Sequence, residues 1–427
     1  MTDSAVIVGA GVIGLATAYR LARDGLDVTV VDAARSEAGA SAHNAGWVVP
    51  IMSAPVPAPG MIGTALKWMG RRESPLSVRL SPRPEHMRFM TGMLRHSNAK
   101  DFQHGLEALT TLNQRTVELF DAYEKDGVPF EYHRTGQLMV FHTRKAMQGY
   151  QAAAEEVGRI GHTAVQLSGD ELRDLEPALG AHVQMGLQCP QERHVDPVSL
   201  LQGLTERCTE LGVRFLFDSP VTAIRHRGPV VTSVVAGGRE LAADVFVLAA
   251  GVRTGVLARQ AGFRLPIQPG KGYGFDDATG AVTLRHSVYL GEAKVAVTPL
   301  ADRVRFAGTM EFGSTGTGVD RHRLRGIVRS AHEYLPALPA NAQPPGWAGL
   351  RPMTPDGLPV IGPLPGKDNV LVASGHCMLG VTLAPVTAEV ISAQIKGGRQ
   401  ESPVTRMARP FDPRRFASGR TRTAAHS

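Results

Sequence analysis

Three glycines near the start of the chain are spaced for binding a phosphate group. Gly9, Gly11 and Gly14 form a G-x-G-x-x-G pattern after a β-branched run. The first glycine permits a tight turn, the second lets the backbone approach a pyrophosphate, and the third lets a helix pack on the strand. Val12 and Ile13 open that helix, whose N-terminal amides and dipole favour an anion. The pattern predicts a dinucleotide-binding turn.

A carboxylate at the end of the next strand fits the same unit. Residues 27–32 form a mostly β-branched run that ends at Asp32. This residue lies about twenty positions past the glycines, where a carboxylate accepts hydrogen bonds from ribose hydroxyls. It argues against NADP, whose 2′-phosphate it would repel, although the nearby Arg35 weakens that argument. The motif does not separate NAD from FAD, and a β-α-β unit without a nucleotide is the alternative.

A loop of small residues follows at positions 41–46. Ala42, Ala45 and Gly46 leave room for a flat ring to approach the backbone. Ser41 and Asn44 supply hydrogen-bond partners for a phosphate or a ring edge. The loop predicts a second contact with a nucleotide cofactor, and a simple polar turn is the alternative.

The elements that position these residues follow from the spacing of apolar side chains. The run after the glycines has helical spacing, and residues 107–120 show the same spacing for a second helix. Residues 168–171 resemble the cap of a further helix. We expect strands at residues 136–141, 288–297 and 304–306, in a mixed sheet.

Composition places the chain among globular proteins. It has 427 residues, of which 43% are hydrophobic and 20% charged. These values favour a large buried core and exclude disorder over the whole chain. The sequence contains no apolar run near the ~18 residues of a membrane span, and its start lacks the features of a secretory signal. We therefore expect a cytoplasmic protein, with peripheral contact at the inner membrane face as a further hypothesis.

The cysteines and the net charge add two expectations. Cys189, Cys208 and Cys377 are too far apart for a zinc site or a redox pair, so we expect buried thiols and no metal. The net charge is +7, and arginines concentrate in a tail at residues 406–427. We expect this tail to be solvated and partly disordered.

Four segments, in order along the chain, carry a family resemblance. They are residues 5–14, 41–50, 242–251 and the pair of blocks at 347–362 and 375–385. Together they resemble the D-amino-acid oxidase superfamily, and more narrowly the bacterial D-amino-acid dehydrogenases. A proline-rich stretch at residues 53–60 and the residues 66–70 also fit that group. The resemblance extends from residue 5 to about residue 395.

The resemblance implies an α/β fold with a Rossmann-like FAD-binding domain and a discontinuous α+β substrate domain built on a mixed sheet. The FAD-binding domain is expected to take residues 1–80, 186–265 and 346–405. The substrate domain then takes residues 81–185 and 266–345, and the basic tail takes residues 406–427.

The resemblance also implies FAD as the cofactor. The last helix of the fold is expected to point its N-terminus at the pyrimidine end of the flavin, where its dipole stabilises negative charge. The residues expected to contact FAD are Gly9, Gly11, Val12, Ile13, Gly14, Asp32, Ser41, His43, Asn44, Ala45, Gly46, Val221, Ala250, Gly251, Gly375, Leu379, Gly380, Val381 and Thr382.

Two residues are expected to contact the substrate. Arg351 lies in the block whose family counterpart binds the substrate carboxylate, and a guanidinium suits this role because its planar fork is always charged. The alternative is a structural bond from Arg351 to Asp356 or to a carbonyl. Tyr273 is expected either to hydrogen-bond the carboxylate or to be a half-buried sheet residue. Met378 departs from the glycine-oxidase pattern, and His376 is expected to make a local hydrogen bond.

The implied activity is oxidative deamination of D-amino acids to 2-keto acids and ammonia, by hydride transfer to the flavin. A quinone or another acceptor would take the electrons. Oxidation of a secondary amine, such as D-proline, cis-4-hydroxy-D-proline or sarcosine, is the alternative. A tRNA-modifying flavoprotein and a non-catalytic nucleotide-binding protein are further alternatives; the sequence contains no RNA-binding module, so we expect no nucleic-acid partner.

Overall fold

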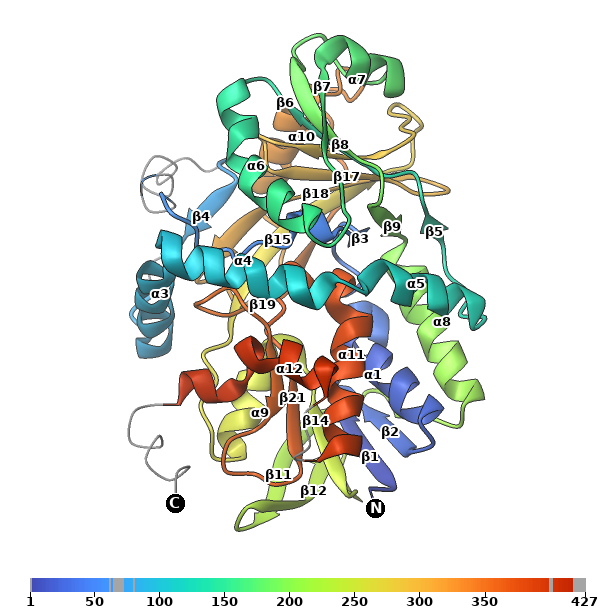
Figure 1. Ribbon diagram of the computed structural model, residues 1–427, viewed down its shortest axis with the longest axis vertical. Coiled ribbons are helices and arrows are strands. Elements are labelled where there is room, and N and C mark those ends of the chain that lie inside the picture. The colour runs from blue at the N-terminus through green and yellow to red at the C-terminus, as the bar shows by residue number, and fades with distance from the viewer. Residues whose placement is uncertain (1, 61–62, 64–72, 80, 399–401, 418–427) are drawn as a thin grey trace.

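The structure is a computed structural model that describes residues 2–60, 63, 73–79, 81–398 and 402–417. The family-like residues 66–70 and the tail arginines at positions 420 and 422 lie outside the described residues. The molecule has two halves, each built around a sheet, and a pair of helices crosses between them (Figure 1).

The first half is a parallel sheet with one antiparallel edge strand. Its order is β10-β2-β1-β14-β21-β20, and only β20 runs antiparallel to its neighbour. The bounds are β1 (Ser4–Val8), β2 (Asp27–Val31), β10 (Arg214–Leu216), β14 (Val245–Leu248), β20 (Val360–Pro363) and β21 (Val370–Ser374).

The strands of this sheet are buried on both faces because different layers cover them. Ala5 and Ile7 of β1 belong to a core shared with helices, whereas Val6 and Val8 belong to a core shared with a small antiparallel sheet. The covering elements are α1 (Val12–Arg23), α8 (Pro197–Glu210) and α11 (Gly380–Gly397) on one face, and α9 (Thr254–Gln260), β11 (Val221–Arg227), β12 (Val230–Ala236) and β13 (Arg239–Ala242) on the other.

The second half is a mixed sheet, as expected for the substrate domain. Its order is β19-β15-β18-β17-β16-β6-β8-β7, and β4 pairs with β18. The bounds are β4 (Leu76–Val78), β6 (Gln137–Phe141), β7 (Val165–Ser168), β8 (Met185–Cys189), β15 (Gln268–Asp277), β16 (Ser287–Leu290), β17 (Val295–Pro299), β18 (Val304–Phe312) and β19 (Gly346–Met353). The α/β fold class is thus confirmed, while the exact domain boundaries stay a prediction.

Smaller elements complete the fold. They are α3 (Pro84–His96), α6 (Arg144–Gly158), α7 (Gly169–Leu175), α10 (Arg321–His332), α12 (Pro403–Met407), the short sheet β3 (Trp47–Val48), β9 (Arg193–Val195) and β5 (Tyr132–His133), and the 3-10 turns η1 (Ser36–Ala38), η2 (Pro50–Met52), η3 (Gly251–Arg253), η4 (Arg409–Phe411) and η5 (Pro413–Phe416). The expected capping box of Ser168 and Glu171 is present at the start of α7.

One predicted helix is wrong in its extent. The apolar spacing at residues 107–120 belongs to two helices, α4 (Ala99–Asn113) and α5 (Thr116–Lys125), which cross the middle of the molecule (Figure 1). Asn113 donates to the carbonyl of Leu109, and the Thr116 hydroxyl donates to the Asn113 side chain at 3.1 Å. Such local side-chain bonds compete with the helical pattern and allow the break between the two helices.

The expectation of a solvated tail is wrong for residues 406–417. Phe411 is fully buried in the core beside α11. The Arg415 guanidinium pairs with Asp356 at 2.6 Å and donates to the carbonyls of Leu358 and Pro359. An apolar anchor and paired charges therefore hold this segment against the dinucleotide-binding half.

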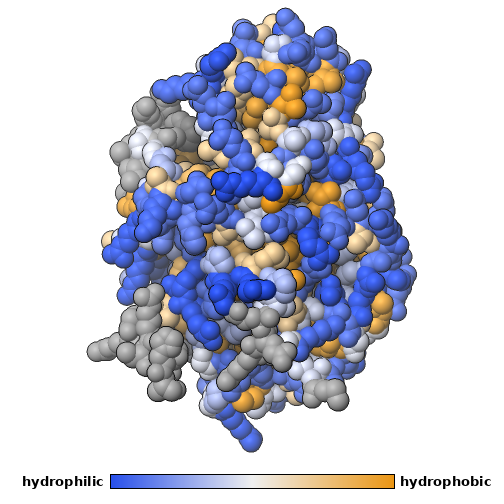
Figure 2. Space-filling view, in the orientation of Figure 1, coloured by the Kyte–Doolittle hydropathy of each residue, from blue (hydrophilic) through white to orange (hydrophobic). Residues whose placement is uncertain are grey.

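Within the part of the chain that the structure describes, no helix has the length and apolar character needed to cross a membrane. In Figure 2, hydrophilic side chains cover most of the face in view, and the apolar ones stand in separate groups. All three cysteines are free and buried, as expected.

Candidate active site

A cavity of about 500 Å³ lies where the two halves meet. One wall is formed by the carboxyl ends of β1, β2 and β14 with the start of α1, and the opposite wall by β19. In open parallel sheets, ligands bind at this edge. The predicted site residues that line the cavity are Gly9, Gly11, Val12, Ile13, Asp32, Ser41, His43, Asn44, Val221, Ala250, Gly251, Arg351, Gly380 and Val381.

The glycine turn has the geometry that its spacing predicts. Gly9 has φ +118°, and a Cβ there would collide with the backbone of Ala249. A Cβ on Gly11 would lie 3.0 Å from the Ser41 hydroxyl, so this face must stay small. Gly14 does not line the cavity, because it packs directly on the carbonyl of Gly9. Gly14 therefore fixes the helix on the strand, and the other two glycines shape the cavity.

Polar side chains tie the ends of the neighbouring loops to this turn. Asp32 accepts from the Ala10 amide at 2.6 Å and from the Ala34 amide at 3.0 Å. The Ser41 hydroxyl accepts from the Val12 amide at 3.0 Å. Both side chains also line the cavity, which places a carboxylate and a hydroxyl beside the first turn of α1.

The loop of residues 41–46 is held by its own amide side chain. Asn44 accepts from the Gly46 amide at 2.7 Å and donates to the Ala40 carbonyl at 3.2 Å. Ala45 and Gly46 do not line the cavity. Gly46 has φ +72° and passes so close to the Val195 carbonyl that no side chain fits there. The small residues thus serve packing on β9, while Ser41, His43 and Asn44 reach the cavity.

Three further predicted contacts lie behind the cavity wall. Gly375 has φ +73° and packs against Thr354, Leu379 precedes α11, and Thr382 joins α11 to the β3 segment. The Thr382 hydroxyl donates to the Trp47 carbonyl at 3.0 Å and accepts from the Val49 amide at 3.3 Å. The structure thus places these three residues as supports of the wall.

Arg351 lines the cavity, and its guanidinium has no carboxylate partner among the described residues. Its Nη1 donates to the Thr309 carbonyl at 2.9 Å. Among the described residues, no Asp or Glu oxygen lies within 4 Å of it, and Asp356 pairs with Arg415 instead. Burial lowers the pKa of Arg351 to about 10, which leaves it charged at neutral pH. A buried cation without an anion is costly, so this site is built to receive one.

A distorted strand presents the carbonyl that holds Arg351. The pairing of β15 with β18 shifts near Gly272, and Thr309 takes φ +58° there. This conformation is strained for a β-branched residue. On the facing strand, the guanidinium lies directly against the Cα of Gly272, where a side chain would clash. Alternate glycines at positions 270, 272 and 274 are a sequence signal for this close approach, although they were not among the predicted site residues.

Tyr273 does not line the cavity, so its position favours the alternative of a sheet residue over a contact with the substrate. Its side chain is fully buried in the core of the mixed sheet. Its hydroxyl donates to the Glu311 carboxylate at 2.7 Å, and that carboxylate pairs with Arg79 at 2.6 Å. Burial, with the Glu311 bond, raises the pKa of Tyr273. Successive side chains of a strand point to opposite faces of the sheet, and that of Tyr273 points into the core. The residue is therefore structural.

His376 lines the cavity, although it was not among the residues predicted to contact the cofactor or the substrate. It is 2% exposed, and its Nε2 bonds the Thr387 hydroxyl at 3.0 Å, which agrees with the expected local hydrogen bond. Its Nδ1 is buried and has no hydrogen-bond partner among the described residues. Burial lowers the pKa of His376 to about 3, so the ring is neutral. The glycine-rich turn before α11 was the signal for it.

Comparison with known proteins assigns the chain to a family. The profile of the FAD-dependent oxidoreductases matches residues 4–394. The chain belongs to this family. A D-amino acid dehydrogenase of Vibrio vulnificus strain CMCP6 is 32% identical over 93% of this oxidoreductase and 97% of the relative. One from Xanthobacter autotrophicus is 33% identical over 92% and 95%. The crystal structure of L-proline dehydrogenase from P. horikoshii matches with a TM-score of 0.76 at 19% identity, over 97% and 98% of the two chains, and so shares the fold.

The cavity of the oxidoreductase fits FAD, the cofactor of its family. The first turn of α1 offers backbone N–H groups that have no acceptor within the helix, which suits a pyrophosphate. Asp32 lines one part of the cavity and Arg351 another. Most of the other lining residues are small or apolar. The predicted cofactor is therefore consistent with the residues present.

Proposed function

We propose that this oxidoreductase deaminates D-amino acids oxidatively. The observation that supports this proposal most strongly is that Arg351 lines the cavity and that its buried guanidinium has no carboxylate partner among the described residues. The names of the relatives at 32% and 33% identity support the amino-acid substrate. A bidentate bond from Arg351 to the substrate carboxylate would fix the α-carbon in one orientation.

The reaction needs little acid or base chemistry from the chain. When bound, FAD would supply the acceptor for the α-hydrogen, which leaves the substrate with its electron pair as a hydride. The substrate amine enters neutral, loses one N–H proton and becomes an imine; water then adds, the C–N bond breaks, and a 2-keto acid and ammonia leave. The neutral His376 and the cationic Arg351 are suited to orientation and charge balance, because neither accepts a proton at neutral pH.

The cofactor contacts follow from the cavity. We propose that the first turn of α1 holds the pyrophosphate, that Asp32 holds the ribose hydroxyls and that Val221 lies at the adenine end. Ser41, His43 and Asn44 then contact the flavin end, with Gly380 and Val381 at the start of α11. Gly14, Ala45, Gly46, Gly375, Leu379 and Thr382 support these contacts from behind.

An anaerobic spectrum tests this function. We expect the purified yellow protein to bleach at its flavin bands when a D-amino acid is added without oxygen, and to stay yellow with the L-enantiomer. Arg351→Ala is expected to keep its flavin and to bleach much more slowly. Equal bleaching by both enantiomers, or none by any amino acid, would contradict the proposal.

Oxidation of a secondary amine is the second candidate. The shared fold with a protein named L-proline dehydrogenase motivates it, and Leu350, Pro352 and Met378 give the cavity apolar surface near Arg351 that suits a ring. A panel of D-alanine, D-proline and sarcosine with a dye acceptor separates the candidates. Turnover of the secondary amines alone would favour this one.

We propose a quinone as the electron acceptor, reached at a membrane surface. Helix α3 shares a core cluster with the cavity-lining Cys377. It exposes Met87 and Leu94 at 59% and 49%, beside the exposed Arg88 and Arg95. Apolar and basic side chains together favour an anionic lipid surface. We expect the protein to sediment with anionic vesicles at low salt and the variant M87S/L94S to lose this binding. Sedimentation that these substitutions leave unchanged would contradict the proposed membrane surface.

A further inference from the structure

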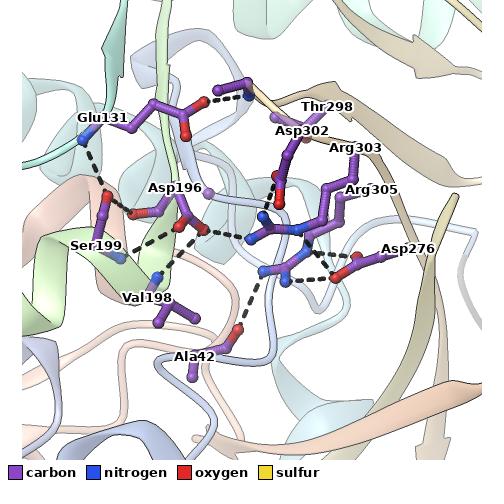
Figure 3. Close-up of polar contacts among 12 residues, drawn as sticks. Ala42, Glu131, Asp196, Val198, Ser199, Asp276, Thr298, Asp302, Arg303 and Arg305 are labelled. Carbon is purple, nitrogen blue, oxygen red and sulfur yellow. Dashed lines mark hydrogen bonds and ion pairs between the residues drawn. The ribbon is translucent and has the colours of Figure 1, made fainter. Parts of the chain in front are cut away.

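A buried ion pair joins two strands of the mixed sheet close to the cavity. Arg305 of β18 bonds Asp276 of β15 in two places, Nε to Oδ1 at 2.8 Å and Nη2 to Oδ2 at 2.9 Å (Figure 3). The Arg305 side chain is 5% exposed. Burial alone would raise the pKa of the Asp276 carboxyl, but its bonds to Arg305 outweigh this effect, so the pKa is lowered and the pair stays charged. The pair leaves one guanidinium nitrogen of Arg305 free for another partner.

That nitrogen binds the backbone of the cavity loop. Arg305 Nη1 donates to the Ala42 carbonyl at 3.1 Å and to the Asn44 carbonyl at 3.2 Å (Figure 3 shows the first bond). The neighbouring Thr298 hydroxyl donates to the Ala45 carbonyl at 2.7 Å. The loop that lines the cavity is therefore fastened from behind by side chains of the mixed sheet, in addition to its own Asn44 bonds.

Stability alone is a weak account of this arrangement. A buried ion pair gains little net free energy, because desolvation of both charges offsets their attraction. Arg305 instead satisfies two loop carbonyls that would otherwise be poorly hydrated, and it fixes the backbone on both sides of His43. His43, Ser41 and Asn44 are the loop residues that reach the cavity.

We propose that Arg305 is a positioning residue for FAD, which orders residues 41–46 so that they meet the cofactor. The proposal rests on the proposed placement of this loop at the flavin end. Arg305 then contributes to the affinity for FAD, although it belongs to the mixed sheet and does not line the cavity. The loop, once released, must be ordered each time the cofactor binds, so the affinity falls.

Arg303 provides a matched control. It lies two residues before Arg305, directly ahead of the first residue of β18. Its side chain bonds the same Asp276 carboxylate at 3.2 Å and bonds Asp196 at 2.9 Å. Among the described residues, the side-chain partners of Arg303 are the carboxylates of Asp196, Asp276 and Asp302, and none of them belongs to the loop. Replacing Arg303 therefore removes a comparable buried charge without releasing the loop.

The test measures release of FAD from the holoprotein, by flavin fluorescence on dilution, for Arg305→Met, Arg305→Lys and Arg303→Met. We expect Arg305→Met to raise the FAD dissociation constant about ten-fold or more and to shift the visible flavin bands. Arg305→Lys, which can still bond one carbonyl, is expected to fall between it and the wild type. Arg303→Met is expected to stay within about three-fold.

Three results would overturn the proposal. One is an unchanged dissociation constant and spectrum in Arg305→Lys. This variant retains a buried cation and keeps the test possible if Arg305→Met does not fold. The second is a loss in Arg303→Met as large as that in Arg305→Met. The third is a melting temperature of FAD-free Arg305→Met so far below that of the wild type that lost stability accounts for the whole loss of FAD affinity. No amino acid is added, so failure of the proposed substrate leaves the result readable.

Discussion

The two ends of the cavity are built in different ways. The phosphate end is made from one continuous stretch, in which Gly9, Gly11 and Gly14 shape the backbone and Asp32 closes the unit. The end that holds Arg351 joins three strands, β15, β18 and β19, that are distant in sequence. Backbone shape dominates the first end, and an unpaired charge dominates the second. Substitutions at the two ends should therefore differ in their effects on catalysis, stability and FAD binding.

The largest expected effect is at the charged end. Arg351→Ala should lower kcat/KM for D-alanine about 100- to 1000-fold, because the substrate carboxylate loses its buried partner. The melting temperature and the FAD content should stay near those of the wild type. Steady-state kinetics with a dye acceptor measure the first, and absorbance of the purified protein measures the second. Turnover within a factor of two of the wild type would contradict the role of Arg351.

Gly9→Ala should damage the phosphate end through the backbone. The residue has φ +118° and no room for a Cβ beside Ala249. We expect a loss of at least about 2 kcal/mol in the free energy of unfolding, together with loss of bound FAD. Urea unfolding and flavin content measure the two. Gly25→Ala, at φ +91° in open space, is the control and should keep its flavin.

Tyr273→Phe distinguishes a structural residue from a site residue. The substitution leaves the buried Glu311 carboxylate with one partner fewer, so the free energy of unfolding should fall by about 1–3 kcal/mol. Because Tyr273 does not line the cavity, KM for D-alanine should stay within about two-fold. A stable variant with a much higher KM would restore the predicted contact with the substrate.

Thr309→Gly should have the smallest effect. Glycine accepts φ +58° without strain, which offsets the loss of the buried Thr side chain, and the carbonyl that holds Arg351 is retained. The free energy of unfolding is expected to stay within about 1 kcal/mol, with KM unchanged. Val304→Gly, on a regular part of the same strand, should lose clearly more. Equal losses in both variants would show that the bulge carries no strain.

The same contrast explains what the sequence could predict. The glycine turn, β1, β2 and Asp32 follow from short-range spacing, and the structure has them where expected. The face of the sheet on which Tyr273 lies depends on strands that only folding brings together. The partner of Asp356 likewise comes from a C-terminal segment that is distant in sequence. Local periodicity also could not reveal the break between α4 and α5, because side-chain bonds of Asn113 decide it. Arg305 was missed because its contacts with the cavity loop lie more than 250 residues away in the chain.

The most direct test of the account compares D-alanine with D-alaninamide, which lacks the negative charge. In the wild type, the carboxylate should make D-alanine the better substrate by about 100-fold or more in kcat/KM. In Arg351→Ala, that preference should shrink to within a few-fold, because the interaction that discriminates the two is gone. A full preference for D-alanine in Arg351→Ala would show that another group binds the carboxylate and would contradict the account.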